Sequence, residues 1–130
     1  MKLLVGYDGS NAAKDALGLA IDHAKAFGAM VYIVTSLDGG EAGDGTRIRQ
    51  CEVDLEAAKK RFDDAGVESA THLLIRGMSP GEDLVAFATE KQVDGIVIGV
   101  KRRSRVGKVL FGSNAQYIIL NAPCPVTSIR

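Results

Sequence analysis

The sequence has no excess of charge of either sign. Sixteen Lys and Arg residues balance sixteen Asp and Glu residues over 130 positions, so the formal net charge at pH 7 is +0. A chain without a global field has no long-range attraction to nucleic acid or anionic lipid, and we expect neither as a partner. Any electrostatic function must therefore come from a local cluster of charges.

Cysteines and long apolar runs are also scarce. The two cysteines, Cys51 and Cys124, have no spacing typical of a metal site, and we expect reduced thiols in a reducing compartment. No apolar run is long enough to cross a bilayer, and the run near the N-terminus is too short for a signal peptide. These observations predict a soluble, cytoplasmic protein.

What the chain does have is a regular alternation of short apolar runs and amphipathic segments. The apolar runs are bounded by turn residues and predict strands at residues 3–5, 31–34, 72–75, 95–99 and 126–129. Apolar residues three and four apart predict a helix after each of the first four strands. Because the strands are apolar on both faces, we predict an α/β fold: a five-stranded, parallel, doubly wound sheet in a three-layer αβα sandwich. We expect one domain over residues 1–130.

The ends of the predicted helices carry recognisable signals. Ser10 is a suitable N-cap for the first helix, and Gly28 is a suitable C-terminal stop. Ser79 and Glu82, three residues apart with Pro80 between them, predict a capping box at the third helix. Cys51 lies on the apolar stripe of the second helix, so we expect it in the core.

The junction after the fourth strand, residues 99–114, has the properties of a phosphate-binding loop. Gly99, Gly107 and Gly112 permit close backbone approach, and Ser113 and Asn114 stand at a predicted helix N-terminus that favours an anion. The loop also carries five basic residues: Lys101, Arg102, Arg103, Arg105 and Lys108. In a doubly wound sheet, ligands bind at the carboxyl ends of the strands where the strand order reverses, which points to this junction and to residues 6–9.

Two common nucleotide motifs are excluded at these junctions. A P-loop needs a glycine five residues before the glycine of its Gly-Lys pair and a Ser or Thr after the lysine. Gly107 and Lys108 supply the pair, but the other two positions hold Arg102 and Val109. The first junction, with Gly6 and Gly9, does not fit the dinucleotide-binding pattern G-x-G-x-x-G.

The chain resembles the universal stress proteins in three separated segments. Nucleotide-binding members carry a glycine, two residues, a second glycine, nine residues, and then a glycine followed by Ser or Thr. Gly99, Gly112 and Ser113 match that spacing here. The start of the chain (residues 5–10) and its end (residues 121–126) also resemble the family, so the likeness spans the whole sequence.

The resemblance implies an adenine nucleotide alpha hydrolase-like fold that binds ATP, ADP or AMP. It implies that Asp8 lies against the nucleoside, with Gly6 and Tyr7 in the same nucleotide site, and that Thr35 and Ser36 line the adenine pocket with Ile98 below. A Mg²⁺ ligand role also suits the Asp8 carboxylate. Gly112, Ser113 and Asn114 would hold the phosphates, and Gly99 belongs to the same nucleotide-binding set. The family also implies a homodimer that pairs its C-terminal strands, here Val126, Thr127, Ser128 and Ile129.

One departure from the family pattern leaves alternatives open. Arg102 replaces the middle glycine, so either its guanidinium grips phosphate directly or its side chain obstructs the loop. The leading hypothesis is a non-enzymatic, dimeric stress-response protein that binds an adenine nucleotide and an unidentified protein partner. The alternatives are a dimeric interaction or chaperone-like module without nucleotide, and a slow ATP hydrolase, for which Asp8 is the one candidate acid.

Overall fold

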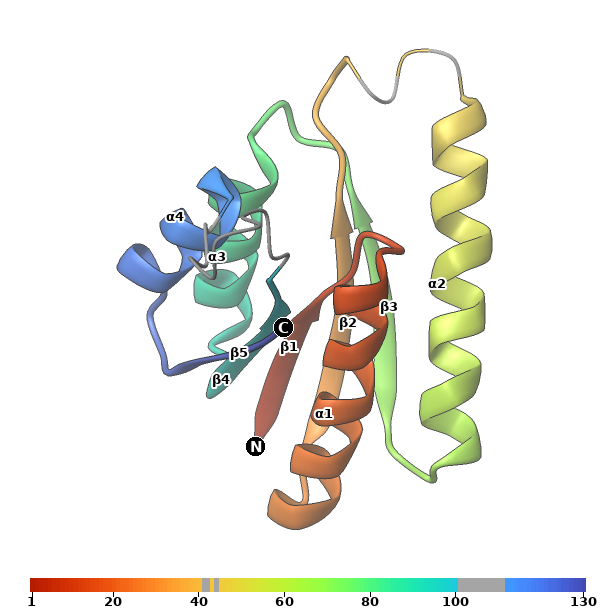
Figure 1. Cartoon of the computed structure of the whole chain (residues 1–130), viewed down its shortest axis with the longest axis vertical. Helices are drawn as coiled ribbons and strands as arrows, with labels where there is room; N and C mark the ends of the chain where they lie inside the picture. Colours follow the sequence, from red (N-terminus) through yellow and green to blue (C-terminus); the bar gives the residue numbers. More distant parts are fainter. Residues whose placement is uncertain (41–42, 44, 101–111) are drawn as a thin grey trace, which may run out of the picture.

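Strands and helices alternate along the whole chain in the order that the sequence predicts (Figure 1). The computed structural model describes residues 1–40, 43, 45–100 and 112–130. The strands are β1 (Lys2–Gly6), β2 (Met30–Ser36), β3 (Ser69–Leu74), β4 (Gly95–Gly99) and β5 (Val126–Ile129). The helices are α1 (Asn11–Phe27), α2 (Thr46–Asp64), α3 (Pro80–Lys91) and α4 (Ser113–Asn121).

The five strands form one parallel sheet in the order β3-β2-β1-β4-β5. The chain winds outward from β1 through β2 to β3, and then returns to place β4 and β5 on the other side of β1. Helices α1 and α2 cover one face, and α3 and α4 cover the other (Figure 1). This arrangement confirms the predicted doubly wound αβα sandwich, with the strand order reversing between β1 and β4.

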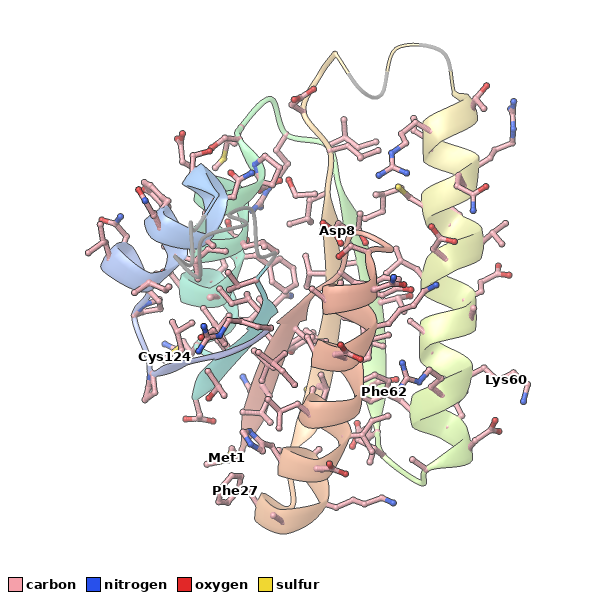
Figure 2. The ribbon with its side chains drawn as sticks, in the orientation of Figure 1. Met1, Asp8, Phe27, Lys60, Phe62 and Cys124 are labelled. Carbon is pink, nitrogen blue, oxygen red and sulfur yellow. The ribbon has the colours of Figure 1, made fainter. Side chains whose placement is uncertain are left out.

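Two cores hold the layers together because successive strand residues point to opposite faces. In β1, Leu3 and Val5 pack in the core under α1 and α2, whereas Leu4 packs in the core under α3 and α4. Phe62 of α2 is fully buried in the same core as Leu3 and Val5, on the side of α2 that faces α1 (Figure 2). Cys51 is buried on the same helix, as predicted, and Cys124 is half-buried; both are free thiols.

The helix ends follow the sequence signals with one difference. The Ser10 hydroxyl accepts a hydrogen bond from the Ala13 N–H at 3.1 Å, and Gly28 ends α1 with a φ of 67°. Ser79 is the N-cap of α3, but its hydroxyl donates to Glu82 Oε1 at 2.9 Å and caps no backbone N–H. The predicted capping box is therefore replaced by a contact between the two side chains.

Strand β3 differs most from its prediction, which was residues 72–75. It begins at Ser69 and ends at Leu74, and all six of its side chains are half-buried. It is an edge strand that, within the described sheet, pairs with β2 alone, so polar Ser69 and Thr71 are tolerated there. The apolar run did not reveal these two residues. In the described part of the chain, no helix combines the length and apolar character needed to span a membrane.

Gly99 provides a test of how closely β4 packs on α1. A Cβ atom at this position would overlap the backbone carbonyl of Ala12. Because backbone cannot move aside cheaply, we expect Gly99→Ala to lower the free energy of unfolding by about 1–3 kcal/mol in urea titrations. Gly39→Ala is the matched control, since a Cβ there meets no atom within 4 Å. Equal stability of the two variants would contradict this packing.

His72 predicts a pH dependence of stability. Its ring lies 4.9 Å from that of Phe87, and burial lowers the pKa of His72, with the charge of Lys91 acting in the same direction. The unfolded chain, with a His pKa of about 6.5, then takes up the proton first, so stability present above that pH declines as the pH falls through it.

We expect His72→Gln to flatten the decline in stability, as measured by urea midpoints between about pH 5 and pH 8. His23→Gln, the same change on α1, is the control for loss of a histidine. A wild-type slope in His72→Gln would refute the assignment.

Candidate functional site

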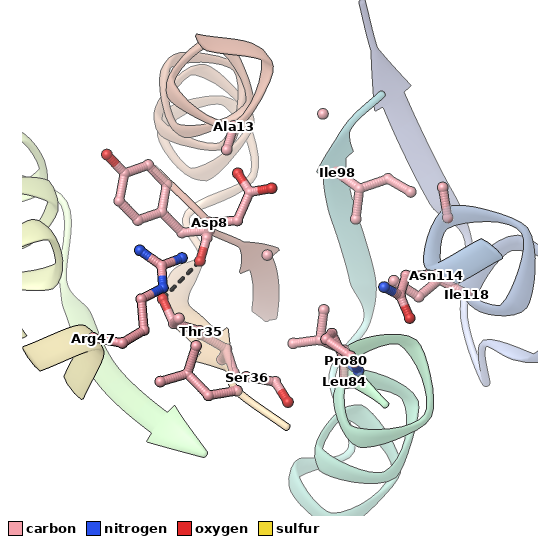
Figure 3. Close-up of a pocket in the computed structure, with 16 residues that line it drawn as sticks. Asp8, Ala13, Thr35, Ser36, Arg47, Pro80, Leu84, Ile98, Asn114 and Ile118 are labelled. Carbon is pink, nitrogen blue, oxygen red and sulfur yellow. Dashed lines mark hydrogen bonds between the residues drawn. The ribbon is translucent and has the colours of Figure 1, made fainter. Parts of the chain in front are cut away.

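Strands β1, β2 and β4 all end at one cavity of about 370 Å³, which we call the main cavity (Figure 3). This volume falls in the range of roughly 300–1,000 Å³ that is typical of small-molecule sites. The cavity opens where the strand order reverses, which is the position that the sequence predicts. Its lining residues are Gly6, Tyr7, Asp8, Ala13, Val34, Thr35, Ser36, Leu37, Arg47, Pro80, Leu84, Ile98, Gly99, Asn114, Ala115 and Ile118.

A second hollow of about 220 Å³, the side cavity, adjoins the main cavity at the start of α4. The two share Asp8, Gly99, Asn114 and Ala115, and the side cavity adds Val100, Gly112 and Ser113. Gly112 is the N-cap of α4, and among the described residues no side chain caps the N–H groups of the first turn. Those groups and the helix dipole make the side cavity suitable for an anion.

Asp8 lies between the two cavities, directly after β1. Its Oδ1 accepts a hydrogen bond from the Ser10 N–H at 2.9 Å, so the turn into α1 holds the carboxylate in place. Figure 2 shows Asp8 at the opposite end of α1 from Phe27. Among the described residues that line either cavity, Asp8 is the only acid.

Tyr7 and Thr35 join the ends of β1 and β2. The Tyr7 N–H donates to the Val34 carbonyl at 2.9 Å, and the Thr35 hydroxyl donates to the Tyr7 carbonyl at 2.7 Å. The Tyr7 side chain packs in the core with α1 and α2. Burial raises the pKa of its phenol, and the Asp54 carboxylate adds to the rise. The Tyr7 ring therefore belongs to the core, although the residue also lines the cavity.

Ser36 is held by a chain of charged groups behind it. Its hydroxyl donates to Asp83 Oδ2 at 2.7 Å, and Asp83 Oδ1 accepts from Arg76 Nε at 2.6 Å. Arg76 also donates to Glu90 Oε1 at 3.0 Å. Asp83 is 0% exposed, and its hydrogen bond raises the pKa of Arg76. This chain ties the ends of β2 and β3 to α3.

Asn114 is oriented by α3 in a similar way. Its Oδ1 accepts a hydrogen bond from the Gly81 N–H at 2.9 Å. A Cβ at Gly81 would lie 2.9 Å from the Asn114 carbonyl oxygen, so glycine permits this close approach of α3 to α4. With Oδ1 engaged, the amide presents its NH₂ group as a donor to the surroundings.

Comparison with known proteins identifies the family. The profile of the Universal stress protein family matches residues 1–130. The chain belongs to the universal stress protein family. It is 32% identical to a universal stress protein of Thermus aquaticus over 134 residues, which cover 98% of this chain and 97% of that protein.

Solved structures of the family have the same fold. A universal stress protein from Archaeoglobus fulgidus is 36% identical, with a TM-score of 0.88 over 100% of this chain and 93% of that one. A structure described as the Archaeoglobus fulgidus universal stress protein in complex with dAMP is also 36% identical, with a TM-score of 0.83 over 100% and 98% of the two chains.

In this universal stress protein, the residues singled out from the sequence come together at the two cavities. Eight of them line the main cavity: Gly6, Tyr7, Asp8, Thr35, Ser36, Ile98, Gly99 and Asn114. Gly112 and Ser113 line the side cavity. The prediction for Arg102, like those for the other basic residues of the loop, falls on residues 101–111 and lies outside the described residues. Strand β5, the predicted dimer strand, is the edge strand next to β4, and none of its residues is among those that line the two cavities.

Sequence reasoning missed the contribution of the helix starts. Arg47 from the first turn of α2 and Pro80 from that of α3 line the main cavity (Figure 3). Leu84 and Ile118 pack in the core under α3 and α4 and also form part of the cavity wall. Asp83, which no motif marked, orients Ser36 from behind. A buried acid in the first turn of a helix carried no distinguishing signal in the sequence.

Proposed function

We propose that this universal stress protein binds an adenine nucleotide, AMP, ADP or ATP, across the two adjoining cavities. The observation that carries the proposal is their arrangement. The N-terminus of α4, which can bind an anion, lies at one end, the partly apolar walls of the main cavity lie at the other, and the Asp8 carboxylate lies between them. The phosphate, ribose and base of a nucleotide follow in the same order. The dAMP complex of the 36% identical relative supports the proposal.

The placement of the nucleotide follows from the chemistry of the walls. Gly112, Ser113 and the Asn114 amide would hold phosphate, because they offer N–H donors at a helix start. Asp8 would accept hydrogen bonds from the ribose hydroxyls, which are donors. The base would lie between Thr35, Ser36 and Ile98, where the wall is partly apolar.

We propose binding without rapid catalysis. Asp8 is the only acid on the described cavity walls, and its Oδ1 already accepts from the Ser10 N–H. With a triphosphate, Asp8 would supply one oxygen ligand to the accompanying Mg²⁺, whose other ligands would be phosphate and water. That role leaves no second described carboxylate to activate water.

We also propose that two copies associate through β5 and that the dimer is the form that meets its protein partner. Strand β5 pairs with β4 on one side and is the last strand of the sheet. The carbonyl oxygens of Pro125 and Ile129 accept from β4, so the backbone groups of Val126 and Ser128 point away from it. Outward N–H and C=O groups on an edge strand are a template for pairing with another chain.

Replacing Asn114 by aspartate tests the phosphate end of the site. Asn114→Asp keeps the oxygen that accepts from Gly81 and replaces the NH₂ donor by a negative oxygen, so it should repel phosphate. We expect AMP to raise the melting temperature of the wild type, and calorimetry to show at least about tenfold weaker binding by Asn114→Asp.

Asn11→Asp is the matched control, because it makes the same change in the first turn of α1, where Asn11 is exposed. Unchanged AMP affinity in Asn114→Asp would refute the phosphate placement. A wild-type melting temperature that does not move at millimolar AMP, ADP or ATP would instead favour the nucleotide-independent module.

A proline at the sheet edge tests the dimer. Ser128→Pro removes an outward N–H and leaves the hydrogen bonds between β5 and β4 in place, so we expect a folded monomer in light scattering after gel filtration. Thr127→Pro is the contrasting control. The backbone of Thr127 faces β4, so losing its N–H should break a hydrogen bond within the sheet and lower the melting temperature. A Ser128→Pro dimer as tight as the wild type would refute pairing through β5.

A further inference from the structure

Two hydroxyl groups in the part of the main cavity proposed to hold the nucleobase already donate their hydrogen within the protein. The Thr35 hydroxyl donates to the Tyr7 carbonyl at 2.7 Å, and the Ser36 hydroxyl donates to Asp83 Oδ2 at 2.7 Å. A hydroxyl has one hydrogen and two lone pairs. What each of these oxygens can still offer a ligand is therefore an acceptor.

The direction of the Ser36 hydrogen bond is imposed by the groups behind it. Asp83 is 0% exposed and forms an ion pair with Arg76, whose Nε donates to Oδ1 at 2.6 Å, so the carboxylate oxygens act as acceptors. Arg76 Nη1 in turn donates to Glu90 Oε1 at 3.0 Å. Ser36 must then be the donor to Asp83. Rotating its hydrogen into the cavity would leave a buried carboxylate oxygen unsatisfied, which is costly.

The opposite end of the site has the opposite character. Asn114 has its oxygen engaged by the Gly81 N–H, so its amide offers hydrogens, as does the first turn of α4. A ligand that spans the site thus meets hydrogen-bond donors at the phosphate end and the acceptor oxygens of Thr35 and Ser36 at the other end. Figure 3 shows Ser36 across from Pro80 and Leu84, so the wall opposite Ser36 is apolar and suits packing against a base ring.

We propose that Ser36 is a specificity-determining residue that accepts a hydrogen bond from an exocyclic amino group of the bound base. Asp83 and Arg76 are positioning residues that keep its oxygen available. The site then favours an amino-substituted purine such as adenine over the corresponding keto purine, because a keto oxygen facing the Ser36 oxygen leaves two acceptors unpaired. This inference rests on the proposed function and names the base selectivity of the same site.

The test compares AMP with IMP, which has a keto oxygen where AMP has the amino group. We expect calorimetry on the wild type to give at least about tenfold tighter binding of AMP. In Ser36→Ala the backbone of residue 36 is unchanged and only the hydroxyl is lost, so the AMP:IMP ratio should fall about fivefold. Ser36→Thr keeps a hydroxyl and should restore the ratio.

Asp83→Asn tests whether Asp83 orients the Ser36 hydroxyl or only stabilises the fold around it. The asparagine oxygen continues to accept from Arg76, while its NH₂ now donates to the Ser36 oxygen and frees the Ser36 hydrogen to face the cavity. We expect AMP affinity to fall and IMP affinity to rise, a reversal that a purely structural role would not produce. Melting temperatures of all variants establish that they fold, and Ser36→Ala carries the test if Asp83→Asn does not.

Each outcome bears on one of the two proposals. Equal wild-type affinity for AMP and IMP, or an AMP:IMP ratio that survives in Ser36→Ala, would overturn the role of Ser36 and leave nucleotide binding intact. Absence of AMP binding by the wild type would overturn the proposed function, and the base selectivity with it.

Discussion

The candidate site depends on the position of β1 in the middle of the sheet, with β2 on one side and β4 on the other. After β1 the chain crosses to one face, and after β4 it crosses to the other, so the two connections diverge. The divergence opens the cavity between Asp8 and Asn114. At the end of β4, Gly99 allows the strand to lie against the backbone of α1, because a side chain at this position would overlap the Ala12 carbonyl.

Helix α3 organises both ends of this cavity from a single turn. The Gly81 N–H holds the oxygen of Asn114, and two residues later the Asp83 carboxylate holds the hydroxyl of Ser36. Each contact uses one hydrogen-bonding capability of its partner and leaves the other for a ligand. The donors and acceptors of the cavity are thus distributed by residues that do not themselves have to touch a ligand.

The polar groups that position the site are satisfied within the described part of the chain, where no buried side-chain nitrogen or oxygen lacks a hydrogen-bond partner. A preorganised site of this kind loses little conformational freedom when a ligand binds. It also makes the network sensitive to single substitutions, since removing one partner leaves a buried group such as Asp83 without compensation.

The sequence by itself determined the order of elements, the parallel sheet and the end of the sheet where a ligand would bind. Apolar runs with regular spacing are local signals, and the rule that ligands bind at a strand-order reversal needs only the topology. It also marked Asp8 and Asn114, whereas the strand end at Thr35 and Ser36 was indicated only by the resemblance to the family. The beginning of β3 escaped because an edge strand with half-buried side chains has no continuous apolar pattern.

Only the tertiary structure decided which way the site's polar groups face. Ser36 and Asp83 are 47 positions apart, and Gly81 and Asn114 are 33 apart, so no local pattern reveals either hydrogen bond. The same holds for Arg47, which reaches the cavity from the start of another helix. Residue types and spacing are properties of the chain, whereas the direction of a hydrogen bond depends on a partner that folding alone brings near.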